Sequence, residues 1–329
     1  MNRSENLYPI IFKPILKPII WGGTGISKFK NIEIDNKKIG ESWEISNVKD
    51  NISIVENGSL TNSSLENLIK EYKERLVGNT VYNKFGETFP LLFKFIDATD
   101  DLSIQVHPDD KLAKERHDSF GKTEMWYVVK AKEGAYLYSG FEKNITPEQY
   151  IETVKDGTFT DSLMKHFVKE GDVFFLPAGR VHAIGSGCFI AEIQQTSNIT
   201  YRIFDYNRKD ENGNQRELHA ELAKDAIDFK VYDSYKTEYK TNPNTPVELV
   251  TCPYFTTNLV EIEKTLTRDF TNLDSFVVYM CLQGNCTITD NNGYSVEVEK
   301  GKSILIPAET KNLTIKTSEY TKLLETYVR

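Results

Sequence analysis

Short runs of apolar residues, separated by turn-forming residues, dominate the pattern along this chain. The runs are rich in Val, Ile, Phe and Tyr, which favour strands, and they lie at residues 91–96, 103–107, 125–129, 135–138, 173–176, 189–194 and 201–204. Strand signals resume at residue 247 and continue to the end of the chain. Many short strands at such spacing are typical of a β-sandwich or a β-barrel. The pattern therefore predicts a mainly β fold.

Helical periodicity is scarce, and we expect helices at about residues 61–77, 146–165 and 220–229. In the first segment, Ser63 and Glu66 have the spacing of a capping box, and apolar residues follow along one stripe. In the second, Thr146 is the expected N-cap, with Pro147 in the first turn and Gln149 closing the box. The first two segments are interpreted as helical insertions in the β fold.

Two segments far apart in the chain share one template, which reads Gly, five residues, Pro-Ala, three residues, and then a polar residue. The first copy runs from Gly171 to His182, and the second runs from Gly301 to Asn312. The glycine supports a tight turn into an apolar strand, and the proline ends that strand because it has no N–H. The template resembles the second motif of the cupin superfamily. The repeat therefore predicts two cupin (jelly-roll-like) β-barrels, of which only the first keeps the histidine that a metal needs.

A polar stretch at residues 236–246 separates the two copies. A chain of 329 residues is also long for a single core, so two domains are expected. We place a catalytic, metal-binding cupin domain at residues 1–235 and a second, degenerate cupin domain without metal at residues 245–329.

Charge and cysteine usage narrow the class of function. The chain has 40 Lys and Arg against 48 Asp and Glu, a net charge of -8, which argues against nucleic acid or an anionic membrane as the main partner. The N-terminal apolar residues are interrupted by lysines and prolines, so they form neither a signal peptide nor a membrane span. The four cysteines form no CxxC pair, which fits a reducing cytoplasm. We expect a cytoplasmic protein with a small ligand, and the oligomeric state stays open.

Four residues have the chemistry and placement of a metal site. Gln105 and His107 are two apart on a predicted strand, so their side chains leave the same face. Glu124 begins the next strand, and His182 is expected to end the strand that Pro177 closes. Two imidazoles, a carboxylate and an amide oxygen suit Zn²⁺, one ion per chain, and leave a position for substrate or water. The remaining histidines, His117, His166 and His219, are interpreted as surface or structural residues.

Several longer motifs in the sequence are informative in addition to the four metal-site residues. These are Ile20-Trp21-Gly22-Gly23, Gly40-Glu41-Ser42-Trp43-Glu44-Ile45-Ser46, Pro90-Leu91-Leu92-Phe93-Lys94, Leu102-Ser103-Ile104-Gln105-Val106-His107-Pro108, Gly121-Lys122-Thr123-Glu124-Met125-Trp126, Glu192-Ile193-Gln194-Gln195-Thr196-Ser197 and Tyr201-Arg202-Ile203-Phe204-Asp205-Tyr206. Together they resemble the type I mannose-6-phosphate isomerases, specifically their short bacterial form. The resemblance implies zinc-dependent interconversion of mannose 6-phosphate and fructose 6-phosphate through an enediol, with a small anionic sugar phosphate as substrate.

The resemblance also implies that Lys94, Lys122, Glu192 and Arg202 line the same pocket. Arg202 offers a fixed fork of donors, so we expect it to act as an electrostatic clamp. Lys122 or Lys94 is expected to shuttle a proton or contact phosphate, and Glu192 to be an acid–base partner. The alternative is that these residues have no catalytic role. Each lysine would then form a surface ion pair, and Glu192 would be a buried, hydrogen-bonded carboxylate. Which residue is the base, and which binds phosphate, stays open.

The chain departs from the longer members of the family in two respects. Those members carry an extra helical domain and an aromatic residue soon after the last metal-binding histidine, whereas here Ala183 and Ile184 follow His182. Two other functions are compatible with a cupin. One is an iron-dependent dioxygenase, which the amide of Gln105 in place of a third imidazole disfavours. The other is a non-catalytic sugar-binding cupin, because a fold alone does not establish chemistry.

Overall fold

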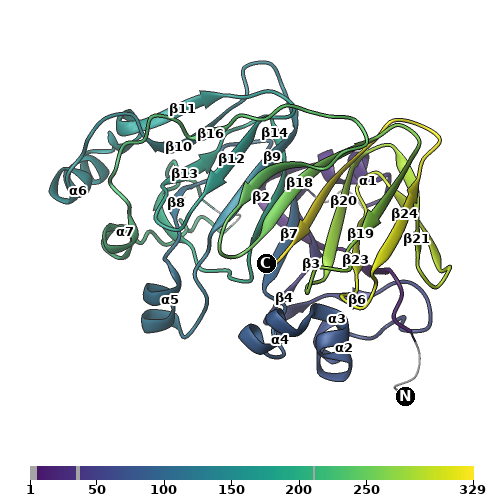
Figure 1. Ribbon diagram of the computed structural model, residues 1–329. Coiled ribbons are helices and arrows are strands. Elements are labelled where there is room, and N and C mark those ends of the chain that lie inside the picture. Colours follow the sequence, from purple (N-terminus) through teal and green to yellow (C-terminus); the bar gives the residue numbers. More distant parts are fainter. Residues whose placement is uncertain (1–5, 35–37, 210–211) are drawn as a thin grey trace.

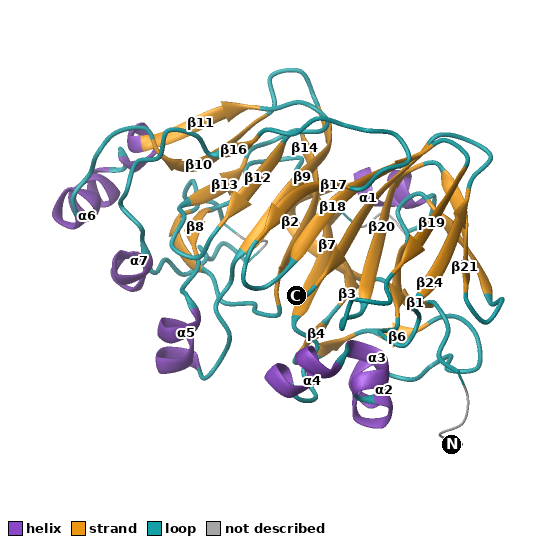
Figure 2. Ribbon diagram, in the orientation of Figure 1, coloured by secondary structure: helices purple, strands orange, loops and turns teal. Residues whose placement is uncertain are grey.

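The computed structural model describes residues 6–34, 38–209 and 212–329, and strands dominate it (Figures 1 and 2). The strands form two jelly-roll-like sandwiches. The paired strands described run antiparallel to each other. The strands of each unit belong to two separate sheets rather than to one closed barrel. The predicted mainly β fold with two jelly-roll-like units is confirmed, with sandwiches in place of closed barrels.

The first sandwich contains a seven-stranded and a five-stranded sheet. The seven-stranded sheet has the order β16 (Lys236–Thr237), β12 (Val173–Leu176), β9 (Glu124–Ala131), β14 (Cys188–Gln195), β7 (Leu91–Asp97), β3 (Ile39–Ile45) and β2 (Ile15–Gly23). The five-stranded sheet has the order β11 (Leu163–Phe167), β10 (Tyr136–Phe141), β13 (His182–Ile184), β8 (Ile104–Val106) and β15 (Tyr201–Phe204).

The second sandwich contains a seven-stranded and a four-stranded sheet. The larger sheet has the order β17 (Val247–Thr251), β18 (Thr256–Ile262), β25 (Thr321–Tyr327), β20 (Val277–Gln283), β23 (Ser303–Ile306), β1 (Ile10–Lys13) and β6 (Ile54–Val55). The smaller sheet has the order β19 (Thr265–Asp269), β24 (Asn312–Lys316), β21 (Asn285–Asp290) and β22 (Ser295–Glu299). A separate two-stranded ladder joins β4 (Asn47–Val48) and β5 (Asn51–Ile52).

The two seven-stranded sheets pack against each other, which makes the molecule four layers deep (Figure 1). Side chains along β9 alternate between two cores, as the period of a strand requires. Met125 and Tyr127 belong to the core shared with Val278 and Leu324 of the second sandwich, whereas Trp126 faces the interior of the first. The site described below therefore lies inside the first sandwich, on the side away from the second.

The N-terminal segment connects the two sandwiches. Strand β1 pairs with β23, with Ile10 opposite Leu305, and also with β6. No strand before residue 91 is predicted from the sequence, although β1 to β6 all precede it. The limits of the two predicted domains stay a prediction, and β1 and β6 are the elements of the first one that join the second sandwich.

Helices occupy the margins of the sheets (Figure 2). They are α1 (Gly25–Lys30), α2 (Leu65–Tyr72), α3 (Glu74–Val77), α4 (Asn79–Phe85), α5 (Asp110–His117), α6 (Pro147–Asp156), a 3₁₀ turn (Phe159–Ser162) and α7 (Ala220–Ala226). Among the described residues, none of these is long and apolar enough to span a bilayer.

The helix predictions are partly right. The capping box at the start of α6 is present, with Thr146 and Gln149 bonded to each other's backbone N–H. The predicted end at residue 165 is wrong, because α6 ends at Asp156 and residues 163–165 belong to β11. The first predicted helix is wrong at its start and in its length. Ser64 rather than Ser63 is the N-cap, and its hydroxyl accepts from the N–H of Asn67. Lys73 has a φ of 47°, which ends α2 and separates it from α3.

The predicted internal repeat is confirmed. Gly171 and Gly301 have φ values of 88° and 86°, so both copies begin with the same turn. Strands β12 and β23 then follow at matching positions, and the next strand starts at His182 in the first copy and at Asn312 in the second. The two sandwiches can therefore be compared residue by residue.

Candidate metal centre and pocket

Two rows of side chains come together inside the first sandwich. In the five-stranded sheet, His182 is paired in register with Gln105, which is paired with Arg202. In the seven-stranded sheet, the corresponding row is Trp126, Glu192 and Lys94. Residues directly opposite each other on neighbouring strands share a face. The ring of Trp126 meets the ring of His182 edge-on at a centroid distance of 5.2 Å, so the two rows are in contact.

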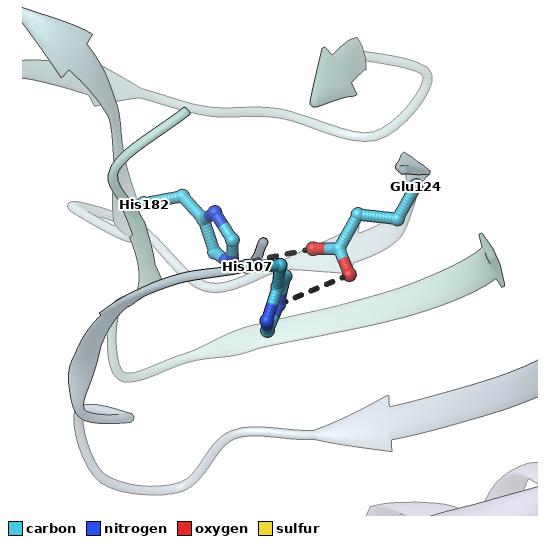
Figure 3. A group of neighbouring side chains, drawn as sticks. All are labelled: His107, Glu124 and His182. Carbon is cyan, nitrogen blue, oxygen red and sulfur yellow. Dashed lines mark ion pairs between the residues drawn. The ribbon is translucent and has the colours of Figure 1, made fainter. Parts of the chain in front are cut away.

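Three of the four predicted metal ligands converge at one end of these rows (Figure 3). The ligand atoms of His107, Glu124 and His182 lie within 4.8 Å of one another. Nε2 of His107 is 3.5 Å from Oε2 of Glu124, and Nε2 of His182 is 3.3 Å from Oε1. The site combines the end of β8, the first residue of β9 and the first residue of β13. Such a set of nitrogen and oxygen donors is what a borderline divalent cation takes.

The backbone fixes the orientation of both imidazoles. Nδ1 of His107 lies 2.8 Å from the carbonyl oxygen of Ile199, and Nδ1 of His182 lies 2.9 Å from that of Arg180. A carbonyl oxygen can only accept, so each Nδ1 carries the proton and donates it. Each Nε2 then has a free lone pair on the side of the Glu124 oxygens, where a cation can bind to both. Hydrogen bonds of this kind accompany histidine ligands in metal sites.

Glu124 is a buried carboxylate whose charge has few partners within the protein. Its side chain is 0 % exposed, and neither carboxylate oxygen accepts a hydrogen bond from a described residue. Its nearest cation is the ammonium of Lys122, 3.0 Å from Oε2. A buried carboxylate without hydrogen bonds is costly. The residues present therefore fit a divalent cation, which would use the orphaned oxygens.

The protonation states also suit a metal. Burial, followed by the nearby ammonium of Lys122, lowers the pKa of His107 to about 3. Burial lowers the pKa of His182 as well. Burial opposes ionisation of Glu124, but the ammonium of Lys122 holds the pKa of that carboxyl well below its usual range. Neutral imidazoles and an ionised carboxylate are the forms that bind metal ions.

Gln105, the fourth predicted ligand, lies beside this group. Its Nε2 is 3.3 Å from Nε2 of His182. An amide has an oxygen and a nitrogen at its end, so a half-turn about its last bond presents Oε1 to the same place. Gln105 also lines the adjoining pocket, whereas the histidines and Glu124 lie behind it.

A pocket of about 330 Å³ opens next to the metal group. It is lined by Ile19, Trp21, Glu41, Lys94, Ile96, Leu102, Ser103, Gln105, Lys122, Trp126, Ile184, Glu192, Asn198, Thr200, Arg202 and Arg216. All four residues predicted for the pocket are among them. Sequence reasoning gave no role to Glu41, Ser103 or Arg216. Ser103 had a usable signal, because it is two residues before Gln105 on the same strand.

A fixed carboxylate–ammonium group forms one wall of the pocket. Nζ of Lys94 is 3.0 Å from Oε1 of Glu192 and 3.6 Å from Oε2 of Glu41. The indole N–H of Trp126 donates to the other oxygen of Glu192 at 2.8 Å. Burial lowers the pKa of Lys94, but the carboxylates of Glu192 and Glu41 raise it by a larger amount. The pKa therefore lies above the usual value for lysine. Lys94 is therefore an ammonium at neutral pH.

Lys122 connects this pocket to the metal group. Its Nζ is 3.0 Å from Nε2 of His107 and 3.0 Å from Oε2 of Glu124. The lone pair of His107 that accepts from Lys122 is the same one that a metal ion uses. The ammonium of Lys122 and a metal ion are therefore alternative partners of that nitrogen.

The three remaining histidines lie outside the metal group, as the sequence predicts. His117 is bonded to the hydroxyl of Tyr201, and His166 lies 3.3 Å from the carbonyl of Ser139. Nδ1 of His219 accepts from the backbone N–H of Arg202. Within the described part of the chain, the group of His107, Glu124 and His182 is the single cluster of this kind.

Comparison with known proteins agrees with this geometry. Residues 10–153 match the model of the phosphomannose isomerase type I catalytic domain, and residues 245–322 match the mannose-6-phosphate isomerase cupin domain. A probable mannose-6-phosphate isomerase of Bacillus subtilis is 33% identical over 94% of this chain and 96% of its own length. A mannose-6-phosphate isomerase of Streptococcus mutans is 34% identical over 92% of this chain and 94% of its own.

A solved structure is similar over nearly the whole chain. The crystal structure of the mannose 6-phosphate isomerase from Bacillus subtilis superimposes with a TM-score of 0.88 at 30% identity, covering 98% of this chain and 100% of that one. The similarity therefore includes both sandwiches. The chain belongs to the type I mannose-6-phosphate isomerase family.

Proposed function

We propose that this chain interconverts mannose 6-phosphate and fructose 6-phosphate and that it uses one zinc ion. The observation that carries the proposal is the buried group of His107, Glu124 and His182, whose carboxylate has no hydrogen-bond partner among the described residues. This group lies beside a pocket that contains two lysines and two arginines. A cation site next to a cationic pocket suits a substrate that carries both sugar oxygens and a phosphate.

Zinc would be held by Nε2 of both histidines, by Glu124 and by the amide oxygen of Gln105. When bound, it would supply a Lewis acid that polarises a sugar oxygen. Neutral imidazoles and one carboxylate support this choice, because they leave a divalent ion with net positive charge. The amide of Gln105 distinguishes the set from one built for iron and oxygen chemistry, which more often has a further imidazole.

Aldose–ketose isomerisation moves one proton from C2 to C1 and another between the two oxygens, through an enediol. We assign the transfer of the carbon-bound proton to Glu192, whose carboxylate is held by Trp126 and Lys94 at the pocket wall. Its carboxylate would accept the proton from C2 and return it to C1. Lys94 stays protonated and orients Glu192. Lys122, next to the metal group, is placed to donate a proton to the oxygen on C1 and to take one back from the oxygen on C2.

Metal removal tests the function directly. The purified protein would be assayed for mannose 6-phosphate conversion before and after complete chelation, and again after zinc is added back. We expect activity to disappear on chelation and to return with stoichiometric zinc. Unchanged activity in protein shown by metal analysis to be free of metal contradicts the zinc mechanism.

The same preparation separates the two alternatives. An iron-dependent dioxygenase predicts oxygen uptake that depends on added ferrous ion. A sugar-binding protein without catalysis predicts binding of mannose 6-phosphate without turnover. Either result, together with an inactive zinc-loaded protein, replaces the isomerase proposal.

A further inference from the structure

A second pocket of about 330 Å³ is built on the same three strands as the pocket beside the metal group, but on their other face. Strands β7, β14 and β9 contribute to both pockets. On β7, Ile96 lines the first pocket and its neighbour Asp97 lines the second, because successive side chains of a strand point to opposite faces. Phe189 is paired in register with Asp97 on one side and with Lys130 on the other. The sheet therefore separates a ligand in this pocket from the metal group.

Lysines at the rim give the second pocket a surplus of positive charge. Lys28, Lys130 and Lys132 line it, and all three are exposed. No carboxylate of a described residue lies within 4.0 Å of their ammonium groups. Nζ of Lys130 is 5.8 Å from the centroid of the Phe29 ring, and Nζ of Lys300, from the second sandwich, is 5.7 Å from the same centroid. Ammonium groups that gather without a carboxylate partner attract an anion.

Asp97 provides an acceptor at the inner end of the pocket. It is 7 % exposed, and its Oδ2 accepts from the backbone N–H of Gly25 at 2.6 Å. No hydrogen bond from a described residue reaches Oδ1. A Cβ on Gly25 would lie 2.5 Å from Oδ1, so glycine at this position leaves room for the oxygen. A carboxylate oxygen that is nearly buried and has no donor is matched by an N–H or O–H group of a ligand.

Electrostatics around Asp97 agree with this role. Burial raises the pKa of Asp97 above its usual value, because the N–H of Gly25 and the ammonium groups of Lys132 and Lys28 oppose the effect only in part. The two lysines act on Asp97 through their charge and form no ion pair with it. The carboxylate and the ammonium groups are therefore separate features of the pocket, and one ligand can use both.

The wall between the rim and Asp97 is apolar. It includes the rings of Phe29 and Phe189, whose centroids are 4.7 Å apart, together with Ala131 and Cys188. The volume is that of a small-molecule site. A ligand that fits has an anionic group for the rim, a flat apolar body for the wall and a donor for Asp97. A nucleoside monophosphate whose base carries an amino group combines these three properties.

We propose that this pocket is a second ligand site, which binds a nucleoside phosphate with its phosphate at Lys28, Lys130 and Lys132 and the amino group of its base at Asp97. The inference goes beyond the proposed function, because none of these residues lines the pocket beside the metal group. The metal group is at the first residue of β9 and the second pocket is at the last two, roughly 20 Å away along the strand.

Calorimetry with the full chain tests the class of ligand. The probes are AMP, adenosine and inorganic phosphate. We expect AMP to bind at least about tenfold more tightly than either of the others, because only AMP uses both the rim and the wall. Added salt should weaken the binding of AMP and leave that of adenosine unchanged, since exposed ammonium groups are screened. Equal affinities for AMP and phosphate would show a site for any anion, and absence of AMP binding would show no site. Both results overturn the proposal.

Two charge reversals test whether AMP binds in this pocket. Lys132→Glu changes the rim, and Lys155→Glu is the matched control, because Lys155 is an exposed lysine of α6 outside the pocket. We expect Lys132→Glu to weaken AMP binding by about tenfold or more, and Lys155→Glu to change it by less than about twofold. Both variants should keep the kcat and KM of the wild type for mannose 6-phosphate.

The outcomes separate this site from the isomerase activity. Equal losses of AMP binding in the two variants would indicate unspecific attraction, and a KM for mannose 6-phosphate that rises together with the AMP dissociation constant would place AMP in the pocket beside the metal group. Either outcome contradicts the second site. If the wild type binds AMP as expected but does not convert mannose 6-phosphate, the proposed function fails and the second site stands.

Purine riboside monophosphate, which is AMP without the amino group, tests the role of Asp97. We expect the wild type to bind AMP about tenfold more tightly than this probe, because the amino group donates to a carboxylate. In Asp97→Asn the preference should fall to about twofold, since the amide keeps the shape and still accepts from Gly25 but carries no charge. The midpoint of thermal unfolding shows that the variant is folded. Equal affinities of the wild type for the two nucleotides would remove Asp97 from the site.

Discussion

The two sandwiches carry a glutamate at the same place in their sheets and use it in opposite ways. Strand register aligns one row of three residues in each unit. The first row is Trp126, Glu192 and Lys94, and the second is Tyr279, Glu325 and Asn258. In both rows an aromatic N–H or O–H donates to the glutamate, at 2.8 Å in the first and 2.6 Å in the second.

The second glutamate is closed off by its neighbours. Nε and Nη2 of Arg268 donate to the two oxygens of Glu325, each at 2.8 Å, and Asn258 donates at 2.9 Å. The side chain of Glu325 is 0 % exposed. In contrast, Glu192 faces a pocket. A carboxylate whose acceptors are all used inside the protein stabilises the fold but cannot act on a ligand.

The two sandwiches also differ at the positions of the proposed metal ligands. The register that aligns Leu176 with Ile306 places Val277 where the first sandwich has Glu124. The repeated template places Asn312 where it has His182. The same framework therefore forms the proposed reaction site where buried charge is left unsatisfied, and a structural core where that charge is paired or replaced by an apolar side chain.

The largest expected effect distinguishes the two copies of the template. His182→Ala removes one imidazole from the metal group, so we expect zinc to be lost and kcat/KM for mannose 6-phosphate to fall by roughly a thousandfold or more, about 4 kcal/mol in barrier height. The measurements are metal analysis and steady-state kinetics. Asn312→Ala is the matched control, and it should keep both zinc and activity. Full zinc occupancy in His182→Ala would show that the ligand is misassigned.

The next effect separates the two glutamates. Glu325→Ala leaves Arg268 buried without its partner, and we expect it to lower the free energy of unfolding by about 3–5 kcal/mol, measured by urea denaturation. Activity of the folded protein should stay within about twofold of wild type. Glu192→Ala should cost less stability, because Lys94 keeps Glu41 as a partner. Its kcat should fall by about 100-fold, as for loss of a general base.

Equal losses of stability in the two variants, with activity retained in both, would contradict the comparison. Unfolding would be followed by two probes, because the two sandwiches can separate into two transitions. A variant that unfolds at the assay temperature would be measured at a lower temperature, where the folded fraction is complete.

The smallest effect is a pH dependence that arises in the first sandwich alone, since residues 245–329 contain no histidine. Burial first, and then Lys122, lower the pKa of His107 from 6.5 to about 3. Below pH 6.5 the unfolded chain therefore binds a proton that the folded chain does not bind until about pH 3. The metal-free protein should lose stability as the pH falls through this window, by about 2 kcal/mol between pH 7 and pH 5 from this residue.

The measurement is urea unfolding in the presence of a chelator at several pH values. The burial of His182 acts in the same direction. His107→Gln is the control, because glutamine keeps a polar side chain but does not titrate, and its stability should depend less steeply on pH. Parallel curves for the variant and the wild type would show that His107 does not carry the effect.

The sequence by itself determined the features that depend on neighbouring residues. The short runs of strand-forming residues predicted the observed bounds of β12 and β15, and Thr146 and Gln149 marked the start of α6. The spacing of Gly171, Pro177 and His182 revealed the repeat, but the prediction that His182 ends the first strand was wrong, because β12 ends at Leu176 and His182 begins β13. The choice between Ser63 and Ser64 was not visible, because both serines have an acceptor side chain and the contacts of the first turn decide between them.

Only the tertiary structure decided which distant residues meet. The pairing of β1 with β23 and the register that aligns Glu192 with Glu325 connect segments far apart in the chain. Arg216 reaches the pocket by way of a loop, and no periodic pattern records that return. Local patterns follow from backbone geometry and side-chain type, which are written into short stretches of sequence. The pairing of strands and the sharing of Asp205 between Arg208 and Arg216 follow from the whole packed chain, whose free energy depends on all its contacts at once.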